Sequence, residues 1–98
     1  MIPVRISAAA ATDLDEIWFH IAADSAANAD QFLDRLVTSI TGMLAVVPLA
    51  GRARDEFEAG LRSFPFESYI VFYRVPKDTV EIVRIIHGAR DLGAIFGE

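Results

Sequence analysis

The chain has 98 residues and a net charge of −5, and 53% of its residues are hydrophobic. This length suits one domain, so we expect residues 1–98 to share a single core. The absence of cysteine excludes disulfide bonds, thiolate nucleophiles and cysteine-bound zinc. With no secretory signal at the N-terminus and no apolar run of about 18 residues, we expect a cytoplasmic protein without membrane contact. The negative charge argues against general nucleic acid binding, which needs clustered Lys and Arg.

The first half of the chain reads as one strand followed by a helix. Alternating apolar residues predict a strand over residues 2–6, where Pro3 favours an edge position. Ser7 is a suitable N-cap for a helix over residues 8–23. The apolar residues of this helix recur at helical spacing, and its acids are assigned to a solvated face that includes Asp13, Asp15 and Glu16.

A second helix follows at once. Ser25 can cap a helix over residues 26–46, and Pro48 ends it because proline disfavours helical geometry in the preceding residue. The turn between the two helices is very short, so they are expected to form an antiparallel hairpin.

The second half changes to strand periodicity after a loop over residues 48–60. Three strands are predicted over residues 61–66, 69–75 and 79–86, joined by turns of hairpin length. We therefore expect an α+β fold of order β-α-α-β-β-β, with the helical hairpin packed on an antiparallel sheet. The middle strand is apolar on both faces, so the C-terminal tail or a partner should cover the face away from the helices. Leu92, Ile95 and Phe96 predict a short docking helix in that tail.

Arginine outnumbers lysine eight to one, and six of the eight arginines lie in residues 50–98. The guanidinium is a planar fork that suits carboxylates, phosphates and base edges. Arg52 and Arg54 follow Gly51 in the loop and are candidates for contact with a phosphate or an acidic partner. The alternative is a solvated loop in which they pair with the neighbouring acids Asp55, Glu56 and Glu58.

Arg62 and Arg84 each interrupt an apolar strand, and Arg84 is expected to share a face with Val80, Ile82 and Ile86. A buried guanidinium without a partner is very costly. The two arginines could together form an anion-binding concavity on the sheet. The alternative is that Arg84 makes an internal salt bridge, for which the candidate acids are Glu67, Glu81 and Asp91.

His87 ends the last strand and precedes Gly88, a position suited to general acid or base work. A hydrogen-bonded packing histidine is the alternative, and His20 is expected to pack on the surface of its helix. The sequence holds no glycine-rich phosphate loop, no GxSxG and no HExxH. We expect no cofactor and no metal.

Taken in order, several segments resemble the RelE/ParE toxins of type II toxin–antitoxin modules, and most closely the ParE branch. The resemblance spans nearly the whole chain. It rests on Asp13-Leu14-x-x-Ile17-Trp18-x-x-Ile21-Ala22, Pro48-Leu49-x-Gly51-Arg52-x-Arg54, Gly60-Leu61-Arg62-Ser63-Phe64, Tyr69-x-x-x-Tyr73-Arg74 and Val83-x-x-Ile86-His87-Gly88-Ala89-Arg90-Asp91.

The resemblance implies a bacterial growth inhibitor that a cognate antitoxin silences, in a hetero-oligomer that forms through an amphipathic helix and an extended segment. The antitoxin is expected on the exposed apolar sheet face and the docked tail. The ParE branch is associated with poisoning of DNA gyrase. The residues expected to contact the target or the antitoxin are Arg52, Arg54, Arg62, Tyr73, Arg84, His87 and Arg90.

The RelE branch of the same family cleaves messenger RNA on the ribosome, and this is the alternative function. Arg62, Arg84 and His87 match the general placement of its catalytic residues. The acidic charge of the chain opposes docking to phosphate-dense ribosomal RNA. The gyrase reading, in which the toxin is not an enzyme, is therefore favoured. An inactive relative retained as an interaction module is the third possibility.

Overall fold

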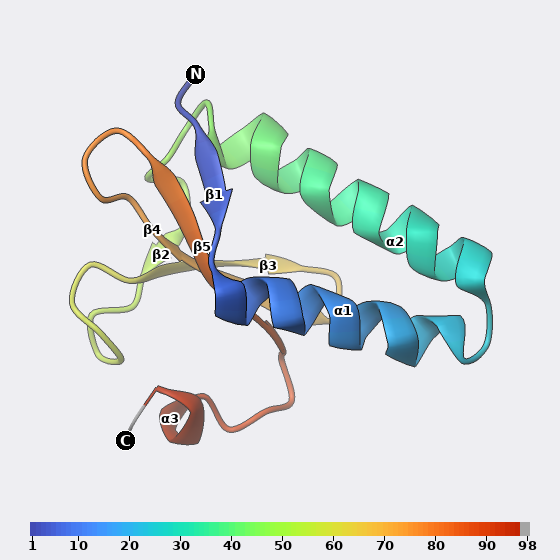
Figure 1. Cartoon of the computed structure of the whole chain (residues 1–98). Coiled ribbons are helices and arrows are strands. Elements are labelled where there is room, and N and C mark those ends of the chain that lie inside the picture. The colour runs from blue at the N-terminus through green and yellow to red at the C-terminus, as the bar shows by residue number, and fades with distance from the viewer. Residues whose placement is uncertain (97–98) are drawn as a thin grey trace.

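The computed structural model describes residues 1–96, in which helices pack on one five-stranded sheet (Figure 1). The strands lie in the order β1-β5-β4-β3-β2. β1 runs parallel to β5 and every other neighbouring pair is antiparallel, so the sheet is mixed rather than wholly antiparallel. The elements are β1 (Val4–Ile6), α1 (Ala8–Ala22), α2 (Ala26–Ser39), a π-helix (Ile40–Leu44), β2 (Arg52–Ala53), β3 (Arg62–Phe66), β4 (Tyr69–Arg74), β5 (Val80–His87) and α3 (Leu92–Ile95).

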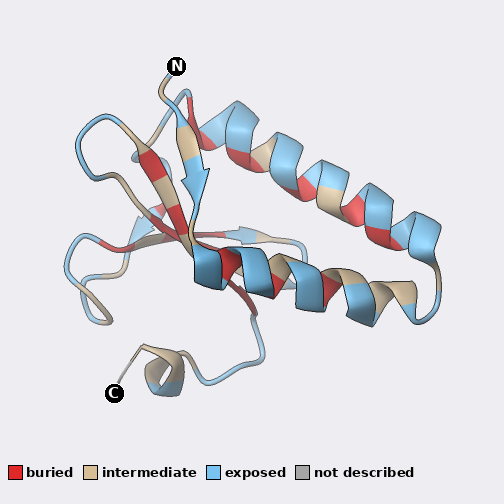
Figure 2. Ribbon diagram, viewed as in Figure 1, coloured by how far each residue is buried: buried red, intermediate tan, exposed pale blue. Residues whose placement is uncertain are grey.

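Both predicted helix caps are confirmed. The hydroxyl of Ser7 accepts the Ala10 N–H at 3.0 Å, and the hydroxyl of Ser25 accepts the Asn28 N–H at 3.1 Å. α1 and α2 form the expected hairpin, and their buried residues face the sheet and each other (Figure 2). α2 ends earlier than predicted, because its last turns continue as a π-helix. No helix in residues 1–96 is long and apolar enough to cross a membrane.

The sheet carries apolar side chains on both faces, as the sequence of β4 predicted. Val71 and Tyr73 belong to the core beneath the helices, whereas Phe72 belongs to a second cluster on the opposite face. The C-terminal segment covers that second cluster: the Phe96 ring lies 4.8 Å from the Phe72 ring, and Phe57 stacks on Phe96 at 5.6 Å. The sequence predicted that either the C-terminal tail or a partner would cover the sheet face away from the helices. In the structure, the tail covers it.

A register shift in β5 changes which residues share a face. Tyr73 lies opposite Ile82 while Phe72 lies opposite Arg84, so Val83 has no partner on β4. The extra residue places Ile82 in the helix-side core and Ile86 in the cluster on the other side. The prediction that Arg84 shares a face with both isoleucines was wrong, because simple alternation does not anticipate a bulge.

The loop expected over residues 48–60 contains a short strand, β2, which pairs with the start of β3. Gly51 precedes this strand and donates its N–H to the buried hydroxyl of Tyr73 at 2.7 Å. A Cβ at Gly51 would lie 2.5 Å from that hydroxyl and 2.8 Å from the Ser63 carbonyl oxygen. Glycine is required here by the close approach of Tyr73 and the β3 backbone.

Replacing Gly51 with alanine should lower the free energy of unfolding by about 1–3 kcal/mol, because the new methyl group collides with backbone and a buried ring. Gly42→Ala is the matched control, since a Cβ there meets nothing within 4 Å. That control should leave stability unchanged or raise it by up to about 1 kcal/mol. Urea unfolding of both variants measures the difference, and equal stability of the two would contradict the packing described for Gly51.

Candidate functional site

β5 is longer than the strand beside it, and side chains complete its outer edge. β1 pairs with β5 only over Val80–Ile82. Beyond that point the Ser7 hydroxyl donates to the Val83 carbonyl at 2.9 Å, and the Ile85 N–H donates to the Asp13 carboxylate at 2.9 Å. Asp13 is 6% exposed. A carboxylate from α1 thus occupies the place where a neighbouring strand would accept a hydrogen bond.

The same carboxylate holds Arg84 through both of its oxygens. Nε of Arg84 lies 2.8 Å from Oδ2 of Asp13, and Nη2 lies 2.9 Å from Oδ1. These hydrogen bonds raise the pKa of Arg84, and the guanidinium in turn neutralises a carboxylate that is almost fully buried. The arrangement joins α1 to β5 across 71 residues of sequence.

The internal salt bridge considered for Arg84 therefore exists, but with a different acid. Glu67 pairs with Arg35, and Glu81 pairs with Arg74 and Arg5. The assignment of Asp13 to a solvated helix face was wrong. A signal was present in the sequence, because Asp13 falls between Ala10 and Ile17 at helical spacing on the buried stripe.

Arg62 and Arg84 do not form a shared anion-binding concavity. Arg62 lies opposite Tyr73, whereas Arg84 lies opposite Phe72, and successive residues of β4 point to opposite faces of the sheet. The Arg62 guanidinium donates to the backbone carbonyl oxygens of Gly51 at 2.7 Å and Leu49 at 3.3 Å. It therefore fixes the loop before β2.

The remaining arginines of the predicted site differ in how they are held. Arg54 donates to the Ser63 hydroxyl at 2.8 Å and pairs with Glu56, one of the acids expected for it. Arg52 is exposed and makes no ion pair or side-chain hydrogen bond with the described residues. Tyr73 is fully buried, so its side chain offers no surface to a partner in this conformation.

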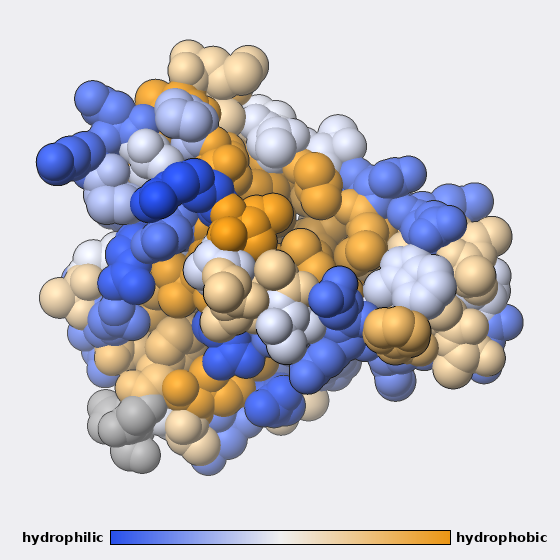
Figure 3. All heavy atoms as spheres, in the orientation of Figure 1, coloured by the Kyte–Doolittle hydropathy of each residue, from blue (hydrophilic) through white to orange (hydrophobic). Residues whose placement is uncertain are grey.

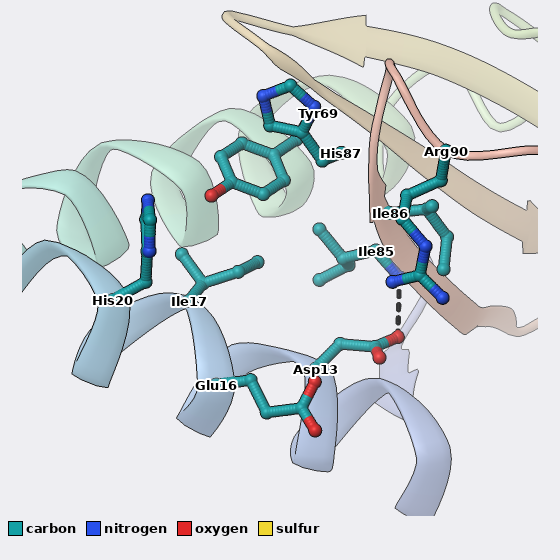
Figure 4. A pocket seen from close by; sticks show the side chains of 9 residues that line it. All are labelled: Asp13, Glu16, Ile17, His20, Tyr69, Ile85, Ile86, His87 and Arg90. Atoms are coloured by element: carbon teal, nitrogen blue, oxygen red, sulfur yellow. Dashed lines mark hydrogen bonds between the residues drawn. The ribbon is translucent and has the colours of Figure 1, made fainter.

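A cavity of about 320 Å³ opens between α1 and the C-terminal half of β5 (Figure 4). Helix α1 contributes one wall and the end of β5 the other, with Tyr69 entering from β4. The hydrogen bond from the Ile85 N–H to Asp13 closes one side, drawn as a dashed line in the figure. The lining residues are Asp13, Glu16, Ile17, His20, Tyr69, Ile85, Ile86, His87 and Arg90.

His87 stands at the mouth of this cavity and is exposed. Its Nδ1 accepts the Ala89 N–H at 3.1 Å, so the neutral imidazole carries its proton on Nε2. The Tyr69 ring meets the His87 ring edge to face at 5.3 Å. Burial raises the pKa of Tyr69, so its hydroxyl remains a hydrogen-bond donor at neutral pH.

Three further polar side chains reach the cavity without a hydrogen bond or ion pair among residues 1–96: Glu16, His20 and Arg90. Of these, only Arg90 was predicted to belong to a site. Glu16 was placed on a solvated face and His20 was expected to pack on the surface. Their convergence depends on how α1 crosses the end of β5, which periodicity within α1 alone does not specify.

Known proteins are similar to this chain along most of its length. Residues 4–92 match the family model described as the ParE toxin of the type II toxin–antitoxin system parDE. Toxin ParE1 of Caulobacter vibrioides is 33% identical over 99% of this chain and 100% of its own length. Toxin ParE3 of the same organism is 28% identical, covering 88% of this chain and 86% of its own.

Two solved structures share the fold. One, from the chromosomal ParDE toxin–antitoxin system of P. aeruginosa, has a TM-score of 0.69 and 24% identity, and covers 89% of this chain and 96% of that one. The other, from the toxin–antitoxin complex RelBE2 of Mycobacterium tuberculosis, has a TM-score of 0.64 and 27% identity. It covers 88% of this chain and 96% of that one. This chain therefore shares its fold, a helical hairpin on a sheet, with a chain of each of these two structures.

Asp13→Ala should lower the free energy of unfolding by about 2–4 kcal/mol, because it leaves Arg84 and the Ile85 N–H without their acceptor. Arg35→Ala is the control, since it removes an exposed ion pair with Glu67. Exposed pairs contribute about 0–1 kcal/mol. Thermal or urea unfolding measures both variants. If the two variants lost equal stability, Asp13 would not hold α1 against β5.

Proposed function

Because this chain belongs to the ParE toxin family of type II toxin–antitoxin systems, we propose that it arrests bacterial growth by poisoning DNA gyrase. A cognate antitoxin binds the toxin and neutralises it. The observation that carries this proposal is the family match, which runs from β1 to the start of α3. The toxin acts in the cytoplasm, where gyrase is found.

The contacts of the arginines support a toxin that binds its target rather than one that cleaves RNA. Arg84 is held by Asp13, and Arg62 is held by loop carbonyl oxygens on the other face of the sheet. Neither is free to stabilise a phosphorane. The net charge of −5 also opposes docking to the ribosome.

Within the set predicted to contact the target, three side chains are exposed: Arg52, His87 and Arg90. We assign the gyrase contact to these residues. Arg54 and Arg62 then act indirectly, since their hydrogen bonds hold the segment that carries Arg52. Tyr73 supports the same segment through Gly51.

The antitoxin is assigned to an apolar groove between the end of α2 and β3. The sheet face expected for it is already covered by the tail. The groove is lined by Met43 and by Phe64, Pro65 and Phe66 of the β3 edge, with Thr38, Ser39 and Gly42 beside them. Exposed Val46, Val47 and Leu49 follow on the adjoining turn. Figure 3 shows apolar side chains gathered between the two helices on the face toward the viewer.

A ribosome-dependent endoribonuclease is the second candidate. The observation in its favour is that His87, His20 and Arg90 line one open cavity. His87 has the position of an acid or base, but its Nδ1 is occupied by the Ala89 N–H. Messenger cleavage would have to use residues other than the paired Arg84.

Purified toxin should inhibit the supercoiling activity of gyrase, and the antitoxin from the adjacent gene, if one is present there, should restore it. The combined variant Arg52→Ala, His87→Ala and Arg90→Ala should weaken inhibition at least tenfold through loss of partner contacts. Arg5→Ala is the control, because its exposed side chain lies on β1, outside the proposed contact. A supercoiling assay over a range of toxin concentrations measures each protein.

Intact supercoiling at a large excess of folded toxin would contradict the gyrase proposal. Messenger RNA from induced cells then separates the two candidates. Gyrase poisoning predicts DNA damage with intact messengers, whereas the endoribonuclease predicts messenger fragments that appear only when ribosomes are present. Growth without arrest after induction in the absence of antitoxin would instead identify an inactive relative.

A further inference from the structure

β1 is the last strand on its side of the sheet, and its outer edge carries free backbone groups. The N–H and C=O of one strand residue point to the same side, and the direction alternates with each residue. The residues that flank β1 both bond to β5: the Pro3 carbonyl oxygen accepts at 2.9 Å, and the Ser7 N–H donates at 3.0 Å. Val4 and Ile6 therefore direct their backbone groups away from the sheet.

This edge is accessible. The N–H and C=O groups of Val4 and Ile6 have no hydrogen-bond partner among residues 1–96. Ile6 is 44% exposed, and the side chain of Arg5 beside it is 64% exposed. In Figure 1, no helix or strand of the described residues crosses in front of β1. Two donors and two acceptors on an exposed edge are what an extended chain needs to add itself to a sheet.

The charges beside the edge indicate which residue the added chain should carry. A series of alternating charges crosses the sheet face away from the helices, from Glu58 through Arg74 and Glu81 to Arg5. The strand register places Glu81 opposite both Arg74 and Arg5. The series ends on Arg5, whose ion pair with Glu81 is long, at 3.6 Å. An acidic residue on a further strand would continue the alternation.

The other face of β1 calls for apolar residues on either side of that acid. Val4 packs against the core beneath the helices, whereas Ile6 beside it remains 44% exposed. Since the backbone groups of Arg5 point toward β5, an antiparallel strand would meet Arg5 in a non-hydrogen-bonded pair. Side chains approach each other most closely in such pairs, so the acid would lie within reach of the guanidinium.

We propose that the outer edge of β1 binds an extended segment of a partner protein with the pattern apolar–acidic–apolar. The segment adds as an antiparallel strand, with its acid opposite Arg5 and its apolar residues opposite Val4 and Ile6. Each of these two apolar residues exchanges two backbone hydrogen bonds with β1. A second copy of this chain is disfavoured, because antiparallel pairing of two β1 strands about Arg5 would bring like charges together.

The inference goes beyond the proposed function, because this edge lies apart from the groove assigned to the antitoxin and from the residues assigned to gyrase. The probe is the blocked peptide acetyl-Gly-Thr-Val-Glu-Val-Thr-Gly-amide, titrated into ¹⁵N-labelled toxin. The amide signals of Val4 and Ile6 should shift progressively, and both amides should exchange more slowly. The amide of Val80, which already donates to Pro3, should change little.

Backbone methylation of the peptide separates strand addition from other modes of binding. Methylating the nitrogen of both valines removes the donors that face β1, so binding should weaken at least tenfold. Methylating the glutamate nitrogen is the matched control, because that N–H points away from β1, and this peptide should bind like the parent. Equal affinity of the two methylated peptides, or no shift at millimolar parent peptide, would overturn the proposal.

Charge exchange tests the acid. A peptide with lysine in place of glutamate should bind at least threefold more weakly, and Arg5→Glu should reverse that preference. Arg5→Ala should weaken binding of the parent peptide about threefold and leave gyrase inhibition unchanged, so the two proposals fail independently. Arg35→Ala, on α2, is the control and should bind like the parent chain. Equal affinity for both peptides, or Val4 and Ile6 signals that shift with toxin concentration alone, would contradict this partner.

Shifts with toxin concentration alone would identify a second copy of the chain as the occupant of the edge.

Discussion

The fold depends on one carboxylate, which accepts a backbone hydrogen bond at the sheet edge where a neighbouring strand would otherwise accept it. β1 is too short to cover the edge of β5, and the chain turns into α1 at Ser7. The edge beyond Ile82 would expose polar backbone groups to the interior if nothing reached them. Ser7 and Asp13 supply those partners from the beginning of α1. This fixes how the helix crosses the strand, and with it the position of every α1 side chain near the end of β5.

Arg84 follows from the burial of Asp13. A carboxylate that accepts one backbone N–H in a site 6% exposed needs a compensating cation. The bulge at Val83 brings Arg84 into position for a bidentate pair, so the arginine that interrupts an apolar strand serves the fold. The functional consequence is that the cavity beside this pair is left with Arg90 as its free guanidinium, because Arg84 is already bound.

Local sequence patterns were sufficient for the elements and the caps, and insufficient for the contacts between distant segments. Alternation and helical spacing located α1, β3, β4 and β5 within one or two residues, and Ser7 and Ser25 marked the helix starts. The short strand β2 was missed, since its two residues carry too little periodicity. The bulge in β5 was missed because an inserted residue looks like ordinary alternation until the register with β4 is known.

The sequence identified several residues of the candidate site, but it did not predict how those residues are arranged in space. Arg84 was recognised as a residue that needs a partner, but its acid lies 71 positions away on a helix face that appeared solvated. His87 and Arg90 were identified, whereas Glu16 and His20 join them through the crossing of α1 over β5. The close approach of Gly51 to Tyr73 likewise depends on two segments meeting.

Amide hydrogen exchange at Ile85 and His87 tests most directly whether Asp13 completes the edge of β5. Both amides point to the same side of the strand, but Asp13 accepts only the first. The Ile85 amide should exchange slowly, close to the rate set by global unfolding, while the His87 amide exchanges far faster. Fast exchange at both positions, or equal protection of the two, would contradict the role assigned to Asp13.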